Sequence, residues 1–200
     1  MRITELDEFE RRLEDIIGKR SGPCDLRPFV CDGSPLECRI FIVGINPATP
    51  LGGNFWDYWR WSEPKRGFDK SAWQAAYNAK RVEEGDDKSS RTRKVIDLIL
   101  KGLEMASRWP CLETNIYATE KETPGNLKGE EKSTREFDFL LEALEPAIIL
   151  THGKAPEEHV AKKNTAAKII SVPHFSRYWS DGMALSLGKH LGKLVRLMSS

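Results

Sequence analysis

The sequence predicts an α/β protein, with three layers (α/β/α) around a central four-stranded parallel sheet. Short, continuously apolar segments alternate along the chain with longer segments in which apolar residues recur at helical spacing. The apolar segments show no polar alternation, a pattern typical of parallel strands covered by helices on both faces. We expect residues 1–200 to form a single domain, because a chain of this length can enclose one core.

An amphipathic helix is predicted over residues 4–18, where apolar residues recur every three or four positions. Residues 21–37 are rich in Pro, Gly, Cys and Asp and predict irregular structure, so residues 1–37 form a helix and an irregular lead-in. The first strand is predicted at residues 39–45, a run of mainly apolar and β-branched residues, Arg39-Ile40-Phe41-Ile42-Val43-Gly44-Ile45.

A long insertion separates the first predicted strand from the second. Residues 55–107 are expected to be helical and rich in Trp, with helices over residues 69–84 and 90–107. Its first part, residues 55–73, contains Trp56, Trp59, Trp61 and Trp73. Large aromatic side chains are usually buried, so we expect these to form core for two extra helices.

Strands and helices alternate through the rest of the chain. Further strands are predicted at residues 111–117, 147–151 and 168–172, and further helices at residues 133–144, 156–163 and 183–198. In open parallel sheets, ligands bind beyond the carboxyl ends of the strands. That rule selects four segments as candidate functional loops: residues 44–53, 115–122, 151–155 and 173–180.

The charge balance narrows the classes of function. The chain has 31 basic and 30 acidic residues, which argues against a protein that coats nucleic acid indiscriminately. The charge is uneven, because residues 151–200 carry eight basic and three acidic side chains together with all four histidines. Two interpretations stay open for this quarter: solvated helix faces, or a local cationic surface for an anionic partner.

Targeting and membrane signals are not visible in the sequence. Residues 1–20 lack the apolar core of a signal peptide, and no window approaches the roughly 18 apolar residues of a membrane span. The four cysteines, at positions 24, 31, 38 and 111, match no zinc-binding spacing. We therefore expect reduced, structural thiols in a cytoplasmic, monomeric protein with no metal and no other cofactor.

Polar side chains suited to ligand binding follow several of the strands. In the segment Gly44–Ala48, Pro47 turns the chain off the strand and holds the amide of Asn46 at its tip. Asn115 ends the second strand and offers a paired donor and acceptor that can read a base edge. His174 follows the last strand in a polar, aromatic loop. Ordinary roles, as turn residues and a structural histidine, remain open for all three.

Together these motifs resemble the uracil-DNA glycosylase superfamily, most closely its mismatch-specific and single-strand-selective branches. Gly44-Ile45-Asn46-Pro47-Ala48 matches the motif Gly-x-Asn-Pro-Gly except at its last residue, and Phe55-Trp56 resembles a downstream Asn-x-Phe-Trp stretch. Thr114-Asn115 resembles the Thr-Asn at the end of the second strand, and His174-Phe175-Ser176 resembles the closing His-Pro-Ser. The order and spacing agree over residues 38–180.

Two departures from the family pattern keep other functions open. Ala48 replaces a glycine that lies close to the substrate, and Phe175 replaces a proline that rigidifies the loop. One alternative is a catalytically altered or inactive member that binds nucleic acid or a free nucleobase. Another is a small-molecule enzyme on a Rossmann-like sheet, although no Gly-rich phosphate loop and no Gly-x-Ser-x-Gly elbow follows a strand.

The resemblance implies a four-stranded parallel sheet between helices and an enzyme that excises uracil or a related damaged base from DNA. The base would be extruded from single- or double-stranded DNA, and the N-glycosidic bond would be hydrolysed without a metal or other cofactor. By resemblance, Asn46 would position the attacking water. His174 would donate a hydrogen bond to the base as negative charge develops on it.

The resemblance also assigns the residues that bind base and DNA. Asn115 would pair with the edge of the extruded base and Phe55, or next Trp56, would stack on it, with Ile45 as a further base-binding residue. At the rim, Ser176 would bind a flanking phosphate. Arg177 or Tyr178 falls where the family carries a wedge that fills the gap left in the duplex.

Overall fold

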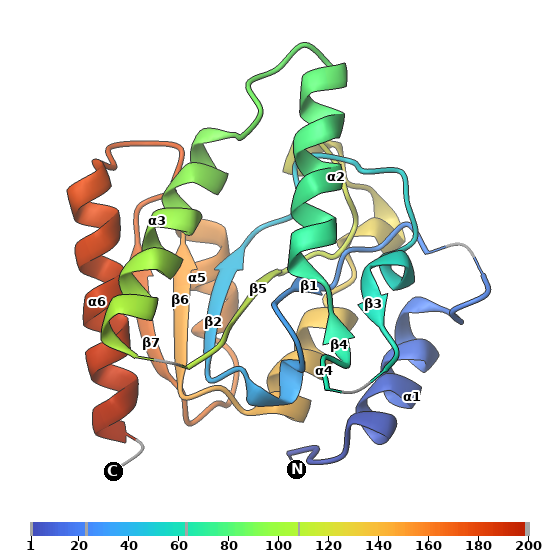
Figure 1. Cartoon of the computed structure of the whole chain (residues 1–200), viewed down its shortest axis with the longest axis horizontal. Coiled ribbons are helices and arrows are strands. Elements are labelled where there is room, and N and C mark those ends of the chain that lie inside the picture. The colour runs from blue at the N-terminus through green and yellow to red at the C-terminus, as the bar shows by residue number, and fades with distance from the viewer. Residues whose placement is uncertain (1, 23, 63, 108, 199–200) are drawn as a thin grey trace.

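A mostly parallel sheet of five strands organises the chain in a computed structural model that describes residues 2–22, 24–62, 64–107 and 109–198 (Figure 1). The order across the sheet is β1 (Phe29–Val30), β5 (Cys111–Asn115), β2 (Ile40–Gly44), β6 (Ile148–His152) and β7 (Lys168–Val172). Strands β5, β2, β6 and β7 are parallel, and β1 pairs with β5 in the antiparallel sense. The predicted α/β class is confirmed, but the sheet has five strands rather than four.

The additional strand comes from the segment predicted to be irregular. Phe29 pairs with Thr114 and Val30 with Glu113, and the Thr114 hydroxyl donates a hydrogen bond of 2.6 Å to the Pro28 carbonyl. A strand of two residues is too short to show the alternation by which strands are predicted. Its pairing with β5 therefore depends on tertiary contacts rather than on a local pattern.

Helices cover both faces of the sheet. They are α1 (Leu6–Ile17), α2 (Lys70–Glu83), α3 (Arg91–Ala106), α4 (Arg135–Leu144), α5 (Lys154–Val160) and α6 (Asp181–Met198). The six predicted helices and the four predicted strands are all present, with ends shifted by at most three residues. Short 3-10 helices span Pro35–Glu37, Phe55–Tyr58, Pro124–Asn126 and Gly129–Lys132. No described helix is both long and apolar enough to cross a lipid bilayer.

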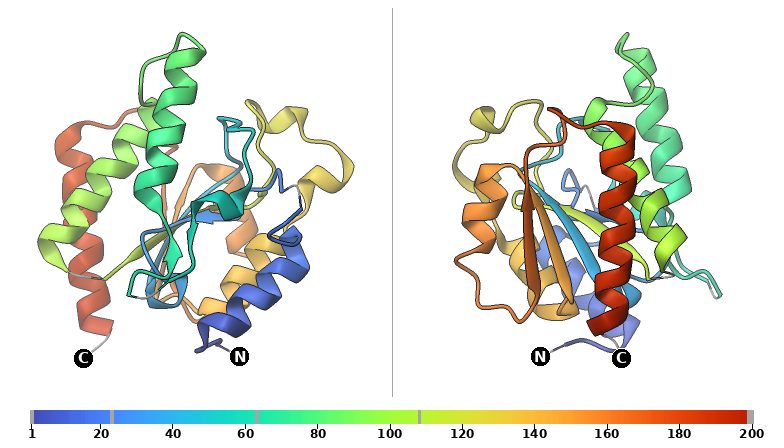
Figure 2. Two further views of the ribbon diagram at one scale, coloured as in Figure 1. Left: turned by 45° about the vertical axis from the view of Figure 1, so that its right-hand side comes forward. Right: turned by 90° about the vertical axis from the view of Figure 1, so that its left-hand side faces the viewer.

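The sheet divides the core into two parts. Phe41 and Val43 of β2 join the cluster formed with α1 and α4, whereas Ile40 and Ile42 join the cluster formed with α3 and α6. Figure 2 shows these two helix pairs on opposite sides of the sheet. A strand that is buried on both faces needs apolar residues at every position, which explains the uninterrupted apolar run of β2.

The Trp-rich insertion is less helical than predicted. After the 3-10 helix Phe55–Tyr58, strands β3 (Trp59–Arg60) and β4 (Gly67–Phe68) form an antiparallel ribbon, and only then does α2 begin. Trp56, Trp59 and Trp73 are buried as expected. Trp61 is 43% exposed, with the Arg20 guanidinium 4.0 Å from its ring centroid, so it is not part of the core.

A buried carboxylate joins α1 to this insertion. Glu10 Oε1 accepts hydrogen bonds of 2.9 Å from Trp59 Nε1 and from Arg66 Nε. Its Oε2 accepts from Arg66 Nη2 at 2.6 Å and from Arg20 Nη2 at 3.1 Å. The Glu10 charge is therefore fully paired although the residue is buried.

Replacing Glu10 by Ala is expected to lower the free energy of unfolding by about 3 kcal/mol, because it leaves the buried indole N–H of Trp59 without an acceptor and removes charge-assisted hydrogen bonds from Arg66 and Arg20. Urea unfolding of the wild type and the variant measures this loss. Glu8→Ala is the matched control, since Glu8 is exposed on the same helix. Equal losses in the two variants would contradict a stabilising role for this cluster.

Candidate functional site

A cavity of about 340 Å³ lies at the carboxyl ends of β2, β5 and β6. Ile45 and Asn46 reach it from the loop after β2, Asn115 from the end of β5, and His174 from the loop after β7. These four residues come from three distant parts of the chain. The structure thus brings together both residues predicted to be catalytic and two of the three predicted to bind the base.

Hydrogen bonds hold the amide of Asn46 in one orientation. Its Nδ2 donates to the carbonyl oxygens of Lys121 at 2.6 Å and Pro47 at 3.2 Å. Both partners are acceptors, so the nitrogen and the oxygen of this amide cannot exchange places. Within the described part of the chain, no donor reaches Oδ1 of Asn46. This oxygen is the atom that can accept a hydrogen bond from a water or a ligand in the cavity.

His174 is held as a neutral donor. Its Nδ1 accepts a hydrogen bond from the Ser176 backbone N–H at 3.2 Å, and Ser176 Oγ lies 2.8 Å away. Because a backbone N–H can only donate, the proton of the neutral ring is on Nε2. Burial, together with the charge of Arg177, lowers the pKa of His174. The ring therefore offers an uncharged Nε2–H at neutral pH.

Asn115, Gly44 and His152 form a row across three adjacent strands. Gly44 pairs with Asn115 of β5, and Val43 pairs with Thr151 of β6, which places His152 on the other side of Gly44. A Cβ atom at Gly44 would lie 2.5 Å from Asn115 Oδ1 and 2.9 Å from His152 Nε2. Position 44 therefore has to be glycine for both side chains to occupy this space.

His152 lines the cavity and lies in one of the four candidate loops, residues 151–155, but the motifs give it no role. It is buried, and its ring stacks on Phe175 with centroids 4.2 Å apart and an angle of 16° between the planes. The His174 ring lies 5.0 Å away, centroid to centroid. The third strand was predicted to end at Thr151, so His152 was counted as a loop residue. His152 lies on the same face of the sheet as Asn115 and Gly44, and this shared face is the feature that could have predicted its place in the cavity.

His152 is expected to make stability depend on pH. Burial and the nearby His174 lower its pKa to about 3, whereas histidine in an unfolded chain has a pKa of about 6.5. Between these values the unfolded state binds a proton that the folded state excludes. Stability is therefore full above about pH 6.5 and falls toward pH 3 by about 1.4 kcal/mol per pH unit. Urea unfolding should show a shallower pH dependence for His152→Phe, and identical dependences would contradict this.

Phe175 is held in the loop after β7 by aromatic contacts on two sides. It is fully buried and contacts His152 on one side and Trp179 on the other, with centroids 5.3 Å apart in the second contact. Trp179 Nε1 donates to the Pro173 carbonyl at 3.2 Å, which links the two ends of the loop. Packing, rather than a proline ring, fixes the loop that carries His174.

Phe55, predicted to stack on the base, is not among the residues that line the cavity. It is buried in an aromatic cluster with Phe29, Trp56, Trp59 and Phe68. Trp56, the second choice, belongs to the same cluster. The aromatic residues that do line the cavity are Phe29, Trp73 and Tyr77. The expectation for Phe55 was wrong because the 3-10 helix turns it into the core.

The three residues predicted to contact DNA lie on the surface, in the loop that carries His174. Ser176 is exposed, and its hydroxyl lies 2.8 Å from His174 Nδ1. Tyr178 is 83% exposed and has a φ of 58°, in the left-handed region. That backbone conformation is unfavourable for a tyrosine and is typical of functional loops.

A charged cluster forms another wall of the cavity. Glu113 of β5 is paired with Arg93 of α3 and, at 2.6 Å, with Lys70 of α2. Burial raises the pKa of Glu113, but the charges of Arg93 and Lys70 outweigh it and lower the pKa to about 2. Trp73 and Tyr77 stack beside this cluster with centroids 5.4 Å apart. No sequence motif marks these residues: those on α2 and α3 have the spacing of ordinary helices, and Glu113 lies inside a strand.

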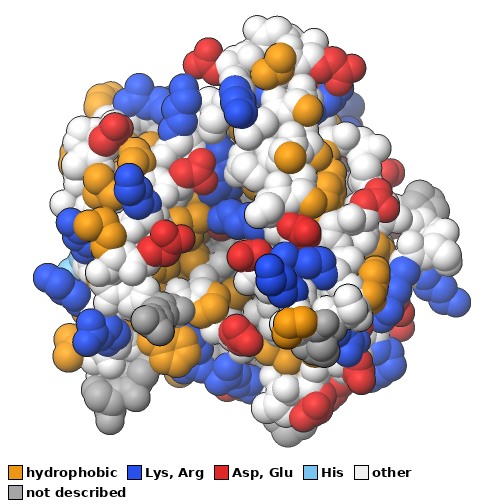
Figure 3. Space-filling model, in the orientation of Figure 1, with side chains coloured by type: hydrophobic (Ala, Val, Ile, Leu, Met, Phe, Trp, Pro, Cys, Tyr) orange, Lys and Arg blue, Asp and Glu red, His pale blue; other side chains and the backbone are white. Residues whose placement is uncertain are grey.

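The positive charge of residues 151–200 is not gathered at the cavity. Lys154 and Arg177 lie at the carboxyl end of the sheet, but the lysines before β7 lie at its other end. Helix α6 then carries Lys189, Lys193 and Arg196 away from it. The arginines that line the cavity are Arg27, Arg81 and Arg93. In Figure 3, Lys and Arg side chains are spread over the whole of this face and alternate with Asp and Glu side chains.

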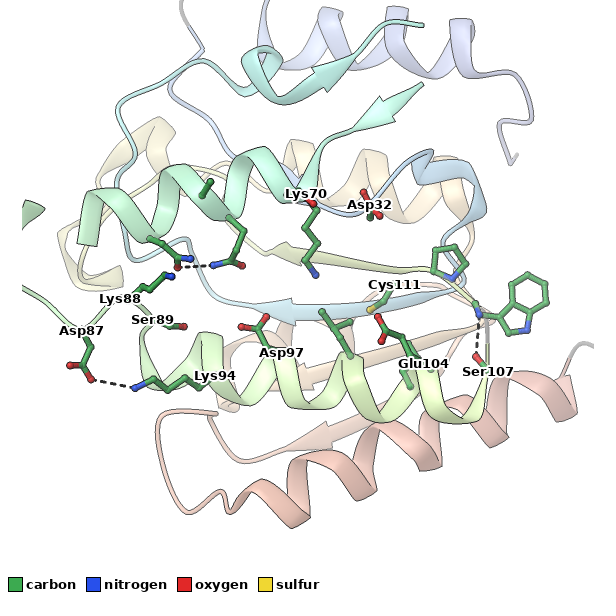
Figure 4. A pocket seen from close by; sticks show the side chains of 18 residues that line it. Asp32, Lys70, Asp87, Lys88, Ser89, Lys94, Asp97, Glu104, Ser107 and Cys111 are labelled. Carbon is green, nitrogen blue, oxygen red and sulfur yellow. Dashed lines mark hydrogen bonds and ion pairs between the residues drawn. The ribbon is translucent and has the colours of Figure 1, made fainter. Parts of the chain in front are cut away.

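A larger hollow of about 1180 Å³ lies between α2 and α3 (Figure 4). Lys70 and Asp97 extend into it from the two helices, and Cys111 lies at its floor. None of the residues predicted to be catalytic or to bind base or DNA lines it. The ion pair of Lys70, which lines this hollow, and Glu113, which lines the cavity at the strand ends, lies between the two.

Comparison of the chain with protein-family models and with curated proteins finds no match. One cavity contains an amide oxygen free to accept, on Asn46, and a neutral ring that donates, on His174. An amide at a strand tip and aromatic walls complete it. These groups suit an uncharged, planar ligand that carries both donors and acceptors.

Proposed function

We propose that this protein is a DNA glycosylase that hydrolyses the N-glycosidic bond of uracil or a related damaged base. The observation that carries the proposal is the meeting of Asn46, Asn115 and His174 in one cavity. The four parallel strands with helices over both faces support the three-layer core that the motifs imply, with β1 as an addition. A cavity of about 340 Å³ lies within the range of small-molecule sites.

The reaction separates the base before water attacks. The bond from sugar C1′ to the base nitrogen breaks, and its electron pair leaves with the base. His174 Nε2–H donates to the base carbonyl as negative charge develops there, a contribution of about 2.7–4 kcal/mol for one such donor. A water held by Asn46 Oδ1 then adds to C1′, and its proton neutralises the base anion. Because a cation at C1′ needs no strong nucleophile, an amide is sufficient to hold this water.

Asn115 and the residues around it recognise the base. Its side-chain amide faces the edge of the base, and the aromatic wall provides the stacking first expected of Phe55. Trp73 and Tyr77 are the substitutes, since they line the cavity, stack on each other with centroids 5.4 Å apart and lie outside the aromatic cluster that buries Phe55. Stacking on one aromatic ring is worth about 1–3 kcal/mol per base.

Tyr178 is expected to fill the gap that an extruded base leaves in a duplex. Replacing it by Gly removes a tyrosine whose backbone is in the left-handed region, and this should stabilise the fold by about 1 kcal/mol. The same change should slow excision from duplex DNA several-fold more than from single strands, because only a duplex leaves a gap to fill. Rates on both substrates and urea unfolding measure these effects. Tyr178→Phe is the control and should retain duplex activity; an equal loss on both substrates would contradict a wedge.

A second function is favoured by Ala48, whose methyl group stands at the cavity where the family has glycine. The alternative is a superfamily member that binds nucleic acid or a free nucleobase without cleaving it. It requires the same base-binding groups but no water held at Asn46. Binding without cleavage is therefore the result that separates it from the enzyme.

The proposal is tested with oligonucleotides that contain one uracil, hypoxanthine or xanthine, in single- and double-stranded form. After incubation, alkali cleaves the strand wherever a base has been removed. We expect cleavage at uracil to be much faster than at cytosine or thymine in matched control strands. Retention of the DNA without cleavage would favour the binding protein, and neither retention nor cleavage would contradict both functions.

A further inference from the structure

We propose that His152 determines the base specificity of this site: its ring N–H faces the amide oxygen of Asn115 across Gly44, so that the amide N–H groups face the base. Such a site accepts bases with a ring carbonyl, as in uracil, and rejects bases with an amino group, as in cytosine. The inference rests on the proposed function and assigns a role to a residue that the motifs do not include.

The first step is the placement of two polar atoms. His152 Nε2 and Asn115 Oδ1 both lie within 3 Å of the point where a Gly44 side chain would begin. They come from strands on opposite sides of β2, and both side chains lean over the glycine. The oxygen of the Asn115 amide therefore leans over Gly44, toward the side of β2 on which the strand of His152 lies.

The second step is the position of the ring proton. His152 Nδ1 is buried and has no hydrogen-bond partner among the residues that the structure describes. A buried N–H without an acceptor is unfavourable, and such groups are rare in folded proteins. Nε2 has the Asn115 oxygen nearby, so the proton belongs on Nε2. Burial and the nearby His174 lower the pKa of His152 to about 3, and the ring is neutral at physiological pH.

The third step is that the ring cannot turn away. Phe175 covers one face of it at a stacking distance of 4.2 Å, and the His174 ring lies beside it. Phe175 is itself fully buried. A fixed donor next to an amide selects one of the two amide orientations, because the reversed amide would bring N–H groups against an N–H group.

The consequence is a choice between two kinds of base. With its oxygen toward His152, the Asn115 amide presents N–H donors to the ligand. Uracil offers a carbonyl oxygen where cytosine offers an amino group, and hypoxanthine differs from adenine in the same way. A donor placed against an amino group cannot form a hydrogen bond. The loss lowers binding of cytosine relative to uracil by about 5- to 150-fold, which corresponds to about 1–3 kcal/mol.

Enzyme kinetics on uracil and cytosine strands test this role. For His152→Phe, which retains a ring to stack on Phe175, we expect the ratio of kcat/KM for uracil to that for cytosine to fall at least about tenfold. His152→Gln keeps an N–H donor and should restore much of the ratio. His159→Phe is the matched control, because His159 lies on α5 and does not line the cavity. Thermal unfolding of each variant shows that it is folded.

A second measurement needs no variant. Nitrogen chemical shifts of the His152 ring in the wild type report which nitrogen carries the proton, and we expect Nε2. A proton on Nδ1 would overturn the inference, as would an unchanged uracil-to-cytosine ratio in a folded His152→Phe that still excises uracil. Both results leave the proposed function intact. A wild type that excises no uracil would instead overturn the proposed function.

Discussion

Replacing His174 by Ala is expected to lower the rate of uracil release by about 100- to 1000-fold, the loss typical of removing one donor to a developing anion. The reason is geometric. Ser176 fixes Nδ1 as an acceptor, which leaves Nε2–H as the only donor of the ring. Single-turnover rates on a uracil oligonucleotide measure the effect, and the loss should be in the rate constant rather than in DNA affinity.

His190→Ala is the matched control for His174, because His190 is exposed on α6 and does not line the cavity. It should leave the rate unchanged. Ser176→Ala should have a smaller effect than His174→Ala, since the backbone N–H of residue 176 still reaches Nδ1. Similar rates for His174→Ala and the wild type would show that the ring does not stabilise the leaving base.

Replacing Asn46 by Ala should have the second large effect, a loss of about 100-fold or more in the rate constant, because the attacking water is no longer held in line with C1′. The change also removes hydrogen bonds to the carbonyls of Lys121 and Pro47, so some stability is lost as well. The affinity for uracil DNA, measured under conditions without turnover, should be nearly unchanged. Equal losses in affinity and in rate would point to collapse of the loop instead of a lost water.

Asn54→Ala provides the comparison for Asn46. Asn54 is also a loop asparagine whose Nδ2 donates to a backbone carbonyl, that of Gly22 at 2.5 Å, but it does not line the cavity. This variant should lose stability without a comparable loss of rate constant. The contrast separates the chemical role of an amide oxygen from the structural role of an amide nitrogen.

The main elements of the fold could be predicted because their patterns are local. Strand β2 is a continuous apolar run, and α3 shows a buried stripe at helical spacing. Strands β1, β3 and β4 have two residues each, and no periodicity exists at that length. Their pairing depends on contacts with residues far away in the chain, which a local pattern does not contain.

The site was partly predictable for a topological reason. Parallel strands end at the same edge of a sheet, so Asn46, Asn115 and His174 had to come near one another once the strands were assigned correctly. The order and direction of the strands do not determine which way a side chain points. Phe55 turns into the core, and His152 reaches the cavity only because Gly44 leaves room beside it.

The most direct test of the enzyme is the release of the base itself. Wild-type protein in excess is incubated with a strand that contains one uracil, and both products are analysed by mass spectrometry. Hydrolysis predicts free uracil in an amount equal to that of the strand carrying a sugar hydroxyl in place of the base. Recovery of the strand at its original mass, with no free uracil, would contradict the central claim.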